Sequence, residues 1–331
     1  MVSAIRKHKI STLVLIDLVC IIVGLNVFAL FHHVLDFSKT AEPVALPSSA
    51  AAEPVRTEAP ALTPAVTEET AFPEESAPVD EPVRGRWGKK FADHFIEGDP
   101  VVTDSSYQSE NIHVVVNHVE ENGLIYNVAD IYLRDLEYLR SGLGGDGFRA
   151  ATEQIGDMSA RLDAVVSISG DHYGARQEGP VVRNGLLYRE TPFEDVCILT
   201  NEGEMITCSA DEFDIESVKE TGAWQIWSFG PALLDDGRPK TEFVSSVTRA
   251  NPRSAIGCVE PGHYVFVQVD GRIDASRGMT MEELSQLFAS LGCTAAYNLD
   301  GGQSAGFTFM GKLWSYPYRR AVWDIIYIGE T

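Results

Sequence analysis

The pattern of apolar and polar residues divides the chain into three parts. Residues 10–31 are almost continuously apolar, residues 38–85 are rich in Pro and acidic residues, and residues 86–331 carry short β-prone runs separated by Gly, Asn and Asp. Short alternating runs between turn residues are typical of β-strands. The pattern therefore predicts a cytoplasmic stub with a membrane anchor over residues 1–37, a disordered linker over residues 38–85 and one folded domain over residues 86–331.

The folded domain is expected to be α+β, strand-rich, with a few packed helices. Hairpin signals occur at three turns, Glu121-Asn122-Gly123, Asn184-Gly185 and Glu202-Gly203. Thr280 and Glu283 form a capping box that opens a helix, and Gly292 ends it. We expect helices at residues 87–96, 152–162 and 280–291, a meander over 180–210, and strands at residues 112–119, 124–133, 164–169, 224–229, 254–259, 264–269, 295–299, 304–310 and 323–328.

Residues 10–31 are long enough to cross a lipid bilayer as one helix. The span is preceded by Arg6, Lys7 and Lys9, and basic residues on this flank favour a cytoplasmic N-terminus. The competing interpretation is a cleaved signal peptide, which usually has a shorter apolar region and ends at a small-x-small pair. Here the apolar run is longer, and no such pair closes it at Phe31. The expected location is therefore the cell membrane, as a single-pass protein with an extracellular domain. Asp17 lies inside the span, where a carboxylate costs about 3 kcal/mol, and it suggests helix–helix association.

The charge and composition of the remaining chain limit its possible partners. Residues 38–85 hold eight of the sixteen prolines and nine acidic residues, a composition that favours a disordered, extended linker. The net charge of the whole chain is −22, and no Lys/Arg cluster follows the first ten residues, so nucleic acid is not an expected partner.

The cysteines suggest neither a structural zinc site nor a dense disulfide framework. Beyond Cys20 in the apolar span, Cys197, Cys208, Cys258 and Cys293 show no CxxC spacing. If Glu202-Gly203 is a two-residue turn, Cys197 and Cys208 lie opposite each other and could form a disulfide. A three-residue loop would shift them apart. No metal and no cofactor is expected.

Candidate chemistry concentrates in residues 297–304. Asn298 and Asp300 are two apart on an expected strand and would share a face. Gly301 and Gly302 would then form a tight turn before a second strand, and their amides could bind an anion. The alternative is an ordinary hairpin in which Asn298 and Asp300 only cap their own backbone.

Two further segments carry charged candidates. Asp171 ends an expected buried strand and could form a pocket wall, or could simply make a turn. Arg249 and Arg253 bracket Asn251-Pro252, and an arginine fork suits a phosphate, although surface ion pairing is the alternative for each.

Four segments in order resemble the phosphodiester glycosidase family, whose members include bacterial envelope proteins. They are residues 167–173 (SISGDHY), 229–233 (FGPAL), 249–257 (RANPRSAIG) and 280–312, which contains YNLDGGQS. Gln303 and Ser169 depart from the usual pattern, which commonly has Gly and Asn there.

The resemblance implies hydrolysis of a sugar-1-phosphodiester, with release of the sugar. It implies Asp300 and Asp171 as the carboxylate pair, without deciding which is nucleophile or base. On the same basis the expected substrate-binding groups are Arg253, Arg249, Asn298, Ser304, Gly230 and the amides of Gly301 and Gly302.

The expected biological setting is envelope or exopolysaccharide glycan metabolism outside the cell. Two alternatives remain open: a catalytically silent, membrane-tethered glycan-binding protein that uses the same cleft, and a scaffold for envelope polymer synthesis.

Overall fold

The computed structural model describes residues 42–48, 85–318 and 320–330. The described residues from Val44 onward belong to one compact unit. The expected membrane span at residues 10–31 and most of the expected linker, residues 49–84, lie outside the described residues. None of the helices within the described segments is long and apolar enough to cross a membrane.

The compact unit is built from four antiparallel sheets. A seven-stranded sheet has the order β17-β15-β16-β5-β4-β3-β2, and its strands are Val101–Val102 (β2), Ser106–Gln108 (β3), Ile112–Glu121 (β4), Leu124–Leu133 (β5), Arg253–Glu260 (β15), His263–Asp270 (β16) and Ala295–Leu299 (β17). A five-stranded sheet has the order β19-β18-β7-β20-β6, with Leu139–Leu143 (β6), Val166–Ser169 (β7), Phe307–Phe309 (β18), Lys312–Leu313 (β19) and Asp324–Ile328 (β20).

The other two sheets lie in the middle of the sequence. The six-stranded sheet has the order β1-β9-β8-β12-β10-β11, with Val44–Ala45 (β1), Val181–Arg183 (β8), Leu186–Arg189 (β9), Asp195–Leu199 (β10), Met205–Ser209 (β11) and Gln225–Trp227 (β12). A short hairpin pairs Leu234–Asp235 (β13) with Arg238–Pro239 (β14). The strand-rich α+β class expected from the sequence is therefore confirmed.

Three α-helices occur in the described segments: Ile155–Arg161 (α2), Ile215–Thr221 (α3) and Met281–Ser290 (α4). The capping box of α4 is confirmed, because Thr280 Oγ1 accepts from the Glu283 amide at 3.1 Å and Glu283 accepts from the Thr280 amide at 2.9 Å. The helix expected at residues 87–96 is wrong: only Ala92–His94 form a 3₁₀ turn (η3). Four more 3₁₀ turns are Leu136–Tyr138 (η4), Gly144–Asp146 (η5), Tyr173–Ala175 (η6) and Gly302–Ser304 (η7).

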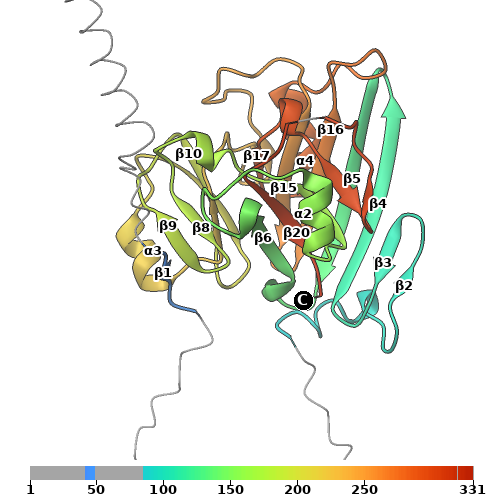
Figure 1. Cartoon of the computed structure of the whole chain (residues 1–331), viewed down its shortest axis with the longest axis horizontal. Coiled ribbons are helices and arrows are strands. Elements are labelled where there is room, and N and C mark those ends of the chain that lie inside the picture. The colour runs from blue at the N-terminus through green and yellow to red at the C-terminus, as the bar shows by residue number, and fades with distance from the viewer. Residues whose placement is uncertain (1–41, 49–84, 319, 331) are drawn as a thin grey trace, which may run out of the picture. The chain divides into compact units, whose positions relative to one another are not determined.

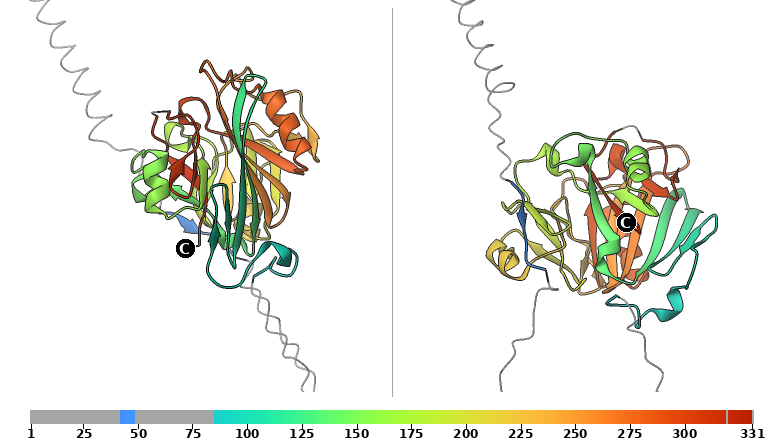
Figure 2. Two further views of the ribbon diagram at one scale, coloured as in Figure 1. Left: turned by 90° about the vertical axis from the view of Figure 1, so that its right-hand side faces the viewer. Right: turned by 60° about the horizontal axis from the view of Figure 1, so that its bottom comes forward.

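Alternation along the strands builds a layered core. Ile112, Val114 and Val116 of β4 belong to the main core cluster, together with Ile168 of β7 and Ile326 of β20. This cluster joins residues of the seven-stranded and five-stranded sheets and extends to Leu199 and Trp227 of the six-stranded sheet. On the other face of the seven-stranded sheet, alternate residues of β16 pack with α4, whereas α2 packs on the five-stranded sheet. The left view of Figure 2 shows α2, in green, and α4, in orange, on opposite sides of the strands.

The β10–β11 connection decides the cysteine pairing. Thr200 and Glu204 close the turn, since the Thr200 amide donates to the Glu204 carbonyl at 2.9 Å, so the loop has three residues. In this register Cys197 faces Thr207 and Cys208 faces Val196. Both thiols are free, and the predicted disulfide is wrong.

Part of the expected linker is an ordered edge strand. Val44 and Ala45 pair with Leu187 and Leu186 of β9, and the Leu46 amide donates to the Gly185 carbonyl at 2.9 Å. Figure 1 shows β1 in blue beside β9. The prediction of continuous disorder over residues 38–85 is therefore wrong for residues 44–46.

Residues 299–307 cross from one sheet to the other. β17 pairs with β15 in the seven-stranded sheet, whereas β18 pairs with β7 in the five-stranded sheet. The ordinary hairpin, which was the alternative reading of residues 297–304, is therefore excluded. The second strand expected at residues 304–310 is shorter than predicted, because η7 occupies Gly302–Ser304 and β18 begins at Phe307. A Cβ on Gly301 would lie 2.5 Å from the Pro252 carbonyl oxygen, so glycine lets the chain pass this close. The crossing places Asp300 where strands of both sheets end.

Candidate active site

A pocket of about 400 Å³ opens at the end of β17, and we call it the Asp300 pocket. Its walls come from sequence segments that lie far apart: residues 176, 193–194, 229–230, 245–247, 251–253, 272, 281, 298–303 and 320. In the part of the chain that the structure describes, no group of three or more His, Cys, Asp or Glu side chains is arranged to hold a metal ion.

Both the backbone and the side chain of Asp300 are held by hydrogen bonds. Its amide donates to the Gly170 carbonyl, just beyond β7, at 2.9 Å. The terminal nitrogen Nη2 of Arg320 donates to both carboxylate oxygens, at 2.6 and 2.8 Å, and Nδ1 of His172 lies 3.2 Å from Oδ2. The Asp300 side chain is 8% exposed and that of Arg320 is 45% exposed. Asp300 is therefore a fixed carboxylate in the wall of a solvent-accessible pocket.

Three other arginines line the pocket and are held by neutral groups. Arg253 donates from Nε to the Met279 carbonyl at 3.1 Å and from Nη2 to two further carbonyls. Arg272 donates to the side-chain oxygen of Asn251. Arg176 donates to the Ser228 carbonyl at 3.1 Å and lies over the rings of Phe193 and Phe229 at 5.1 and 5.2 Å.

These arginines make the pocket positive in a strongly acidic protein. With Arg320, four guanidinium groups line it, against the two carboxylates of Asp300 and Glu194. Burial and the neighbouring Arg272 lower the pKa of Arg253 to about 10, which still leaves the group charged at neutral pH. The pocket can therefore hold an anion such as a phosphate through charge-assisted hydrogen bonds.

Asn298, Gly230 and Gly301, three of the predicted substrate-binding residues, lie in the pocket wall. Asn298 donates from Nδ2 to the Gly230 carbonyl at 2.7 Å, and its buried Oδ1 has no hydrogen-bond partner among the described residues. Gly302 also lines the pocket, but its amide donates to the Pro252 carbonyl at 3.0 Å. The prediction that the Gly302 amide is available to bind an anion is therefore wrong, because this amide already donates a hydrogen bond within the crossing turn.

Asp171 lies outside the pocket, in a buried charge cluster. Its amide donates to Asp324 at 2.7 Å, and its Oδ2 accepts from the Ser228 amide at 2.8 Å and lies 3.5 Å from Nη2 of Arg183. Arg183 donates from Nε to Asp324 at 2.7 Å. The structure therefore does not bring Asp171 and Asp300 together as two carboxylates facing one substrate; Asp171 supports the backbone beneath the site.

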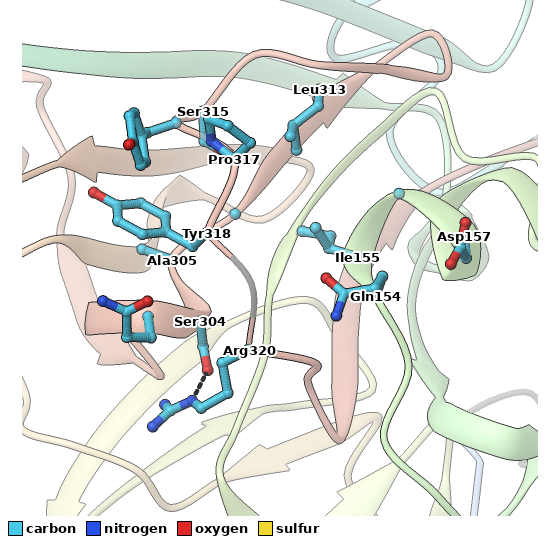
Figure 3. Close-up of a pocket in the computed structure, with 14 residues that line it drawn as sticks. Gln154, Ile155, Asp157, Ser304, Ala305, Leu313, Ser315, Pro317, Tyr318 and Arg320 are labelled. Carbon is cyan, nitrogen blue, oxygen red and sulfur yellow. Dashed lines mark hydrogen bonds between the residues drawn. The ribbon is translucent and has the colours of Figure 1, made fainter.

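Ser304 and Arg249 also differ from expectation in their placement. Ser304 Oγ accepts from Nε of Arg320 at 2.5 Å and lines a neighbouring cavity of about 590 Å³, which Figure 3 shows with Tyr318 and Gln154. Gln303 and Arg320 line both cavities. Arg249 is exposed and lines neither; its carbonyl accepts from Arg253.

Sequence reasoning missed four charged residues of the Asp300 pocket. Arg176, Glu194, Arg272 and Arg320 reach it from segments that carry no local motif of their own. Arg176 does follow the SISGDHY segment by three residues, and Arg272 follows the Asp270-Gly271 turn. Closeness to these two segments was the only sign in the sequence that Arg176 and Arg272 could belong to the site. The four side chains meet in one pocket only when the chain is folded.

Comparisons with known proteins agree with this geometry. The family model described as phosphodiester glycosidase matches residues 162–328, which include all four arginines and both carboxylates of the pocket. The SPbeta prophage-derived uncharacterized protein YomE of Bacillus subtilis is 31% identical over 170 residues, covering 48% of this chain and 26% of the relative. The bovine N-acetylglucosamine-1-phosphodiester alpha-N-acetylglucosaminidase is 27% identical over 186 residues, covering 52% and 32%.

The match thus spans only about a quarter to a third of the length of these relatives. Among solved structures, the catalytic domain of the zebrafish N-acetylglucosamine-1-phosphodiester alpha-N-acetylglucosaminidase, auto-inhibited by its pro-peptide, aligns with a TM-score of 0.54 at 19% identity, over 66% of this chain and 83% of that chain. This structure shares the fold. Because the family model covers half of the sequence and includes the whole Asp300 pocket, the chain belongs to the phosphodiester glycosidase family.

Proposed function

We propose that the protein hydrolyses a sugar-1-phosphodiester in the Asp300 pocket and releases the sugar. The observation that carries the proposal is the charge of the pocket: Arg176, Arg253 and Arg272 donate their hydrogen bonds to neutral groups, so four guanidinium groups face only two carboxylates. A phosphodiester supplies the matching negative charge. The bovine relative is named for N-acetylglucosamine-1-phosphodiesters, and this sugar is the first to test.

The reaction separates charge in a way that the pocket can stabilise. Cleavage of the bond between the anomeric carbon and the phosphate oxygen leaves positive charge on the sugar and negative charge on the phosphate. Asp300 faces the developing positive charge, and the arginines hold the phosphate. The unpartnered Oδ1 of Asn298 is an acceptor that a sugar hydroxyl would satisfy.

Replacement of Asp300 by Asn tests this proposal. The amide oxygen of Asn can still accept from Arg320, so the Asp300→Asn variant should fold. Turnover of N-acetyl-α-D-glucosaminyl phosphate methyl ester should fall about a hundredfold or more, because the charge at the reacting carbon is lost. Substrate binding should fall less, since the arginines remain. The measurement is steady-state release of the free sugar.

Asp235→Asn is the matched control, because Asp235 is exposed on β13 and lies outside the pocket. A folded Asp300→Asn protein with turnover near that of the wild type would contradict the role of Asp300. Substrate binding without turnover by the wild-type protein would favour the alternative of a catalytically silent glycan-binding protein.

We also propose that residues 10–31 anchor the protein in the cell membrane, with the hydrolase domain outside the cell acting on envelope or exopolysaccharide glycans. The apolar span and its flank of Arg6, Lys7 and Lys9 support this location. The mature protein should fractionate with membranes and retain its N-terminal peptide, as read by mass spectrometry. A mature N-terminus beyond Phe31 would show that the segment is a cleaved signal instead.

A further inference from the structure

We propose that Glu194 is the second carboxylate of the reaction, the general base that takes a proton from the attacking water. This role rests on the proposed hydrolysis of a sugar-1-phosphodiester. Asp300 and Glu194 are the two acidic side chains that line the Asp300 pocket, and Glu194 reaches it from the connection between β9 and β10.

The Glu194 carboxylate is available to a ligand. The described residues offer it no hydrogen bond or ion pair, and neither of its oxygens is among the buried unpartnered atoms. Asp300, by contrast, already accepts from Arg320 and lies beside His172. A group that accepts a proton from water needs a carboxylate oxygen without another hydrogen-bond partner. Of the two carboxylates, only Glu194 has both oxygens without such a partner among the described residues.

The backbone holds Glu194 in a conformation that few side chains adopt. Its φ is 47°, in the left-handed region that disfavours residues other than glycine. The next residue, Asp195, is fixed on two sides: its carbonyl accepts from the Tyr297 hydroxyl at 2.5 Å, and its Oδ2 accepts from the Ala232 amide at 3.0 Å.

Those two partners adjoin residues that line the pocket. Tyr297 precedes Asn298 on β17, and Ala232 follows Gly230-Pro231, so the walls of the pocket also fix the position of Glu194. Backbone strain that is maintained by such contacts is commonly found at functional sites.

The electrostatic surroundings of Glu194 suit proton transfer. Burial raises the pKa of Glu194, the adjacent Asp195 raises it further, and Arg176 opposes both. The same pocket is lined by Asp300 and by Arg253, Arg272 and Arg320. A carboxylate with a raised pKa is a stronger base than an ordinary one, and two carboxylates in different environments can take different roles.

The step balances as a single displacement. The water oxygen bonds to the anomeric carbon while one of its protons passes to Glu194. The bond from that carbon to the phosphate oxygen breaks, and its electron pair leaves with the phosphate monoester. Asp300 faces the positive charge on the sugar during the transfer, and Glu194 then returns the proton to solvent. The products are the free sugar and a phosphate monoester.

The test compares Glu194→Gln with Glu190→Gln. Glu190 lies in the same connection, but it is exposed, pairs with Lys219 at 3.1 Å and does not line the pocket. With N-acetyl-α-D-glucosaminyl phosphate methyl ester, Glu194→Gln should lower kcat about a hundredfold with little change in KM, and Glu190→Gln should change neither by more than about twofold.

Two readouts separate a base from a structural residue. For the wild type, kcat should fall on the acidic side as Glu194 becomes protonated, and this limb should be absent in the residual activity of Glu194→Gln. Added formate should restore part of the activity of Glu194→Ala, because it supplies a small carboxylate to the vacated space. If Glu194→Gln fails to fold, the formate response of Glu194→Ala still decides the question.

A folded Glu194→Gln protein with kcat within about threefold of the wild type would overturn the role of Glu194 and leave the proposed hydrolysis intact. So would an acidic limb that persists in this variant, or a Glu194→Ala protein with no response to formate. Wild-type protein that cleaves no sugar-1-phosphodiester would overturn the proposed function, and the role of Glu194 with it.

Discussion

Arg249 and Arg253 show how far one residue's sequence context can mislead about its role. Both flank Asn251-Pro252 and both could bind a phosphate, yet Arg253 is buried in the wall of the pocket and Arg249 is exposed outside it. Asp300 and Asp171 differ in the same way. Each follows a buried strand, but the partners that decide their surroundings, Arg320 and Arg183, lie 20 and 12 residues further along the chain, outside the local pattern. Residue type and local pattern were predictable, whereas the partner was not.

The arginines provide a test at this scale. Arg272→Ala should raise KM for N-acetyl-α-D-glucosaminyl phosphate methyl ester about tenfold or more, because one charge-assisted hydrogen bond to the phosphate contributes about 1.5–3 kcal/mol. Arg249→Ala should leave KM within about twofold, since its side chain lines neither cavity. Equal effects of the two substitutions in steady-state kinetics would mean that the phosphate lies elsewhere.

At the scale of elements, local signals predicted the local structures well. The hairpins at Asn122-Gly123 and Asn184-Gly185 and the capped helix α4 are all present, because their determinants lie within a few residues of one another. The crossing at residues 299–307 was predicted as a strand, a tight turn and a second strand, with an ordinary hairpin as the alternative, since Asp300-Gly301 is a common turn signal. Its outcome depends on which sheet each strand joins, and that choice is made by packing between distant residues.

The capping box of α4 carries a prediction about stability. Arg277 donates a hydrogen bond to Glu283 and lowers the pKa of that carboxyl to about 2, so the charged form stabilises the folded state. Because the pKa of Glu283 is lower in the folded state than in the unfolded chain, where it is about 4.5, the charged carboxylate stabilises the fold at any pH above about 4.5. This contribution is lost as the pH falls from about 4.5 toward about 2. Glu283→Gln keeps the capping geometry and should lower the free energy of unfolding by up to about 1 kcal/mol at pH 7, because the pair is partly exposed.

Denaturant titration at pH 7 and pH 3 measures the free energy of unfolding of the wild type and of Glu283→Gln. The difference between the two proteins should be smaller at pH 3. Glu282→Gln is the control, because Glu282 lies in the same first turn without an ion pair to a basic residue among the described contacts. A Glu283→Gln effect that does not change with pH would show that the charge of Glu283 does not contribute.

At the scale of the whole molecule, the composition of residues 38–85 gave no sign that part of this segment pairs with the folded domain. The acidic, Pro-rich composition of residues 38–85 gives no signal for a two-residue strand, because pairing of β1 is decided by the open edge of β9 and not by its own sequence. The fold class was predictable from strand patterns, while the arrangement of four sheets was not, because their order is set by long-range pairing.

Strand β1 also determines how far the domain can reach from a membrane. If residues 10–31 are the anchor, as proposed, only residues 32–43 connect it to β1. These twelve residues reach at most about 40 Å, even for a fully extended chain. Without the pairing of β1, the connecting length would extend to residue 84. Residues 49–84 add nothing to this length, because the chain enters and leaves them within the same compact unit. If the proposed hydrolysis also holds, its substrates would be glycans close to the surface of the bilayer.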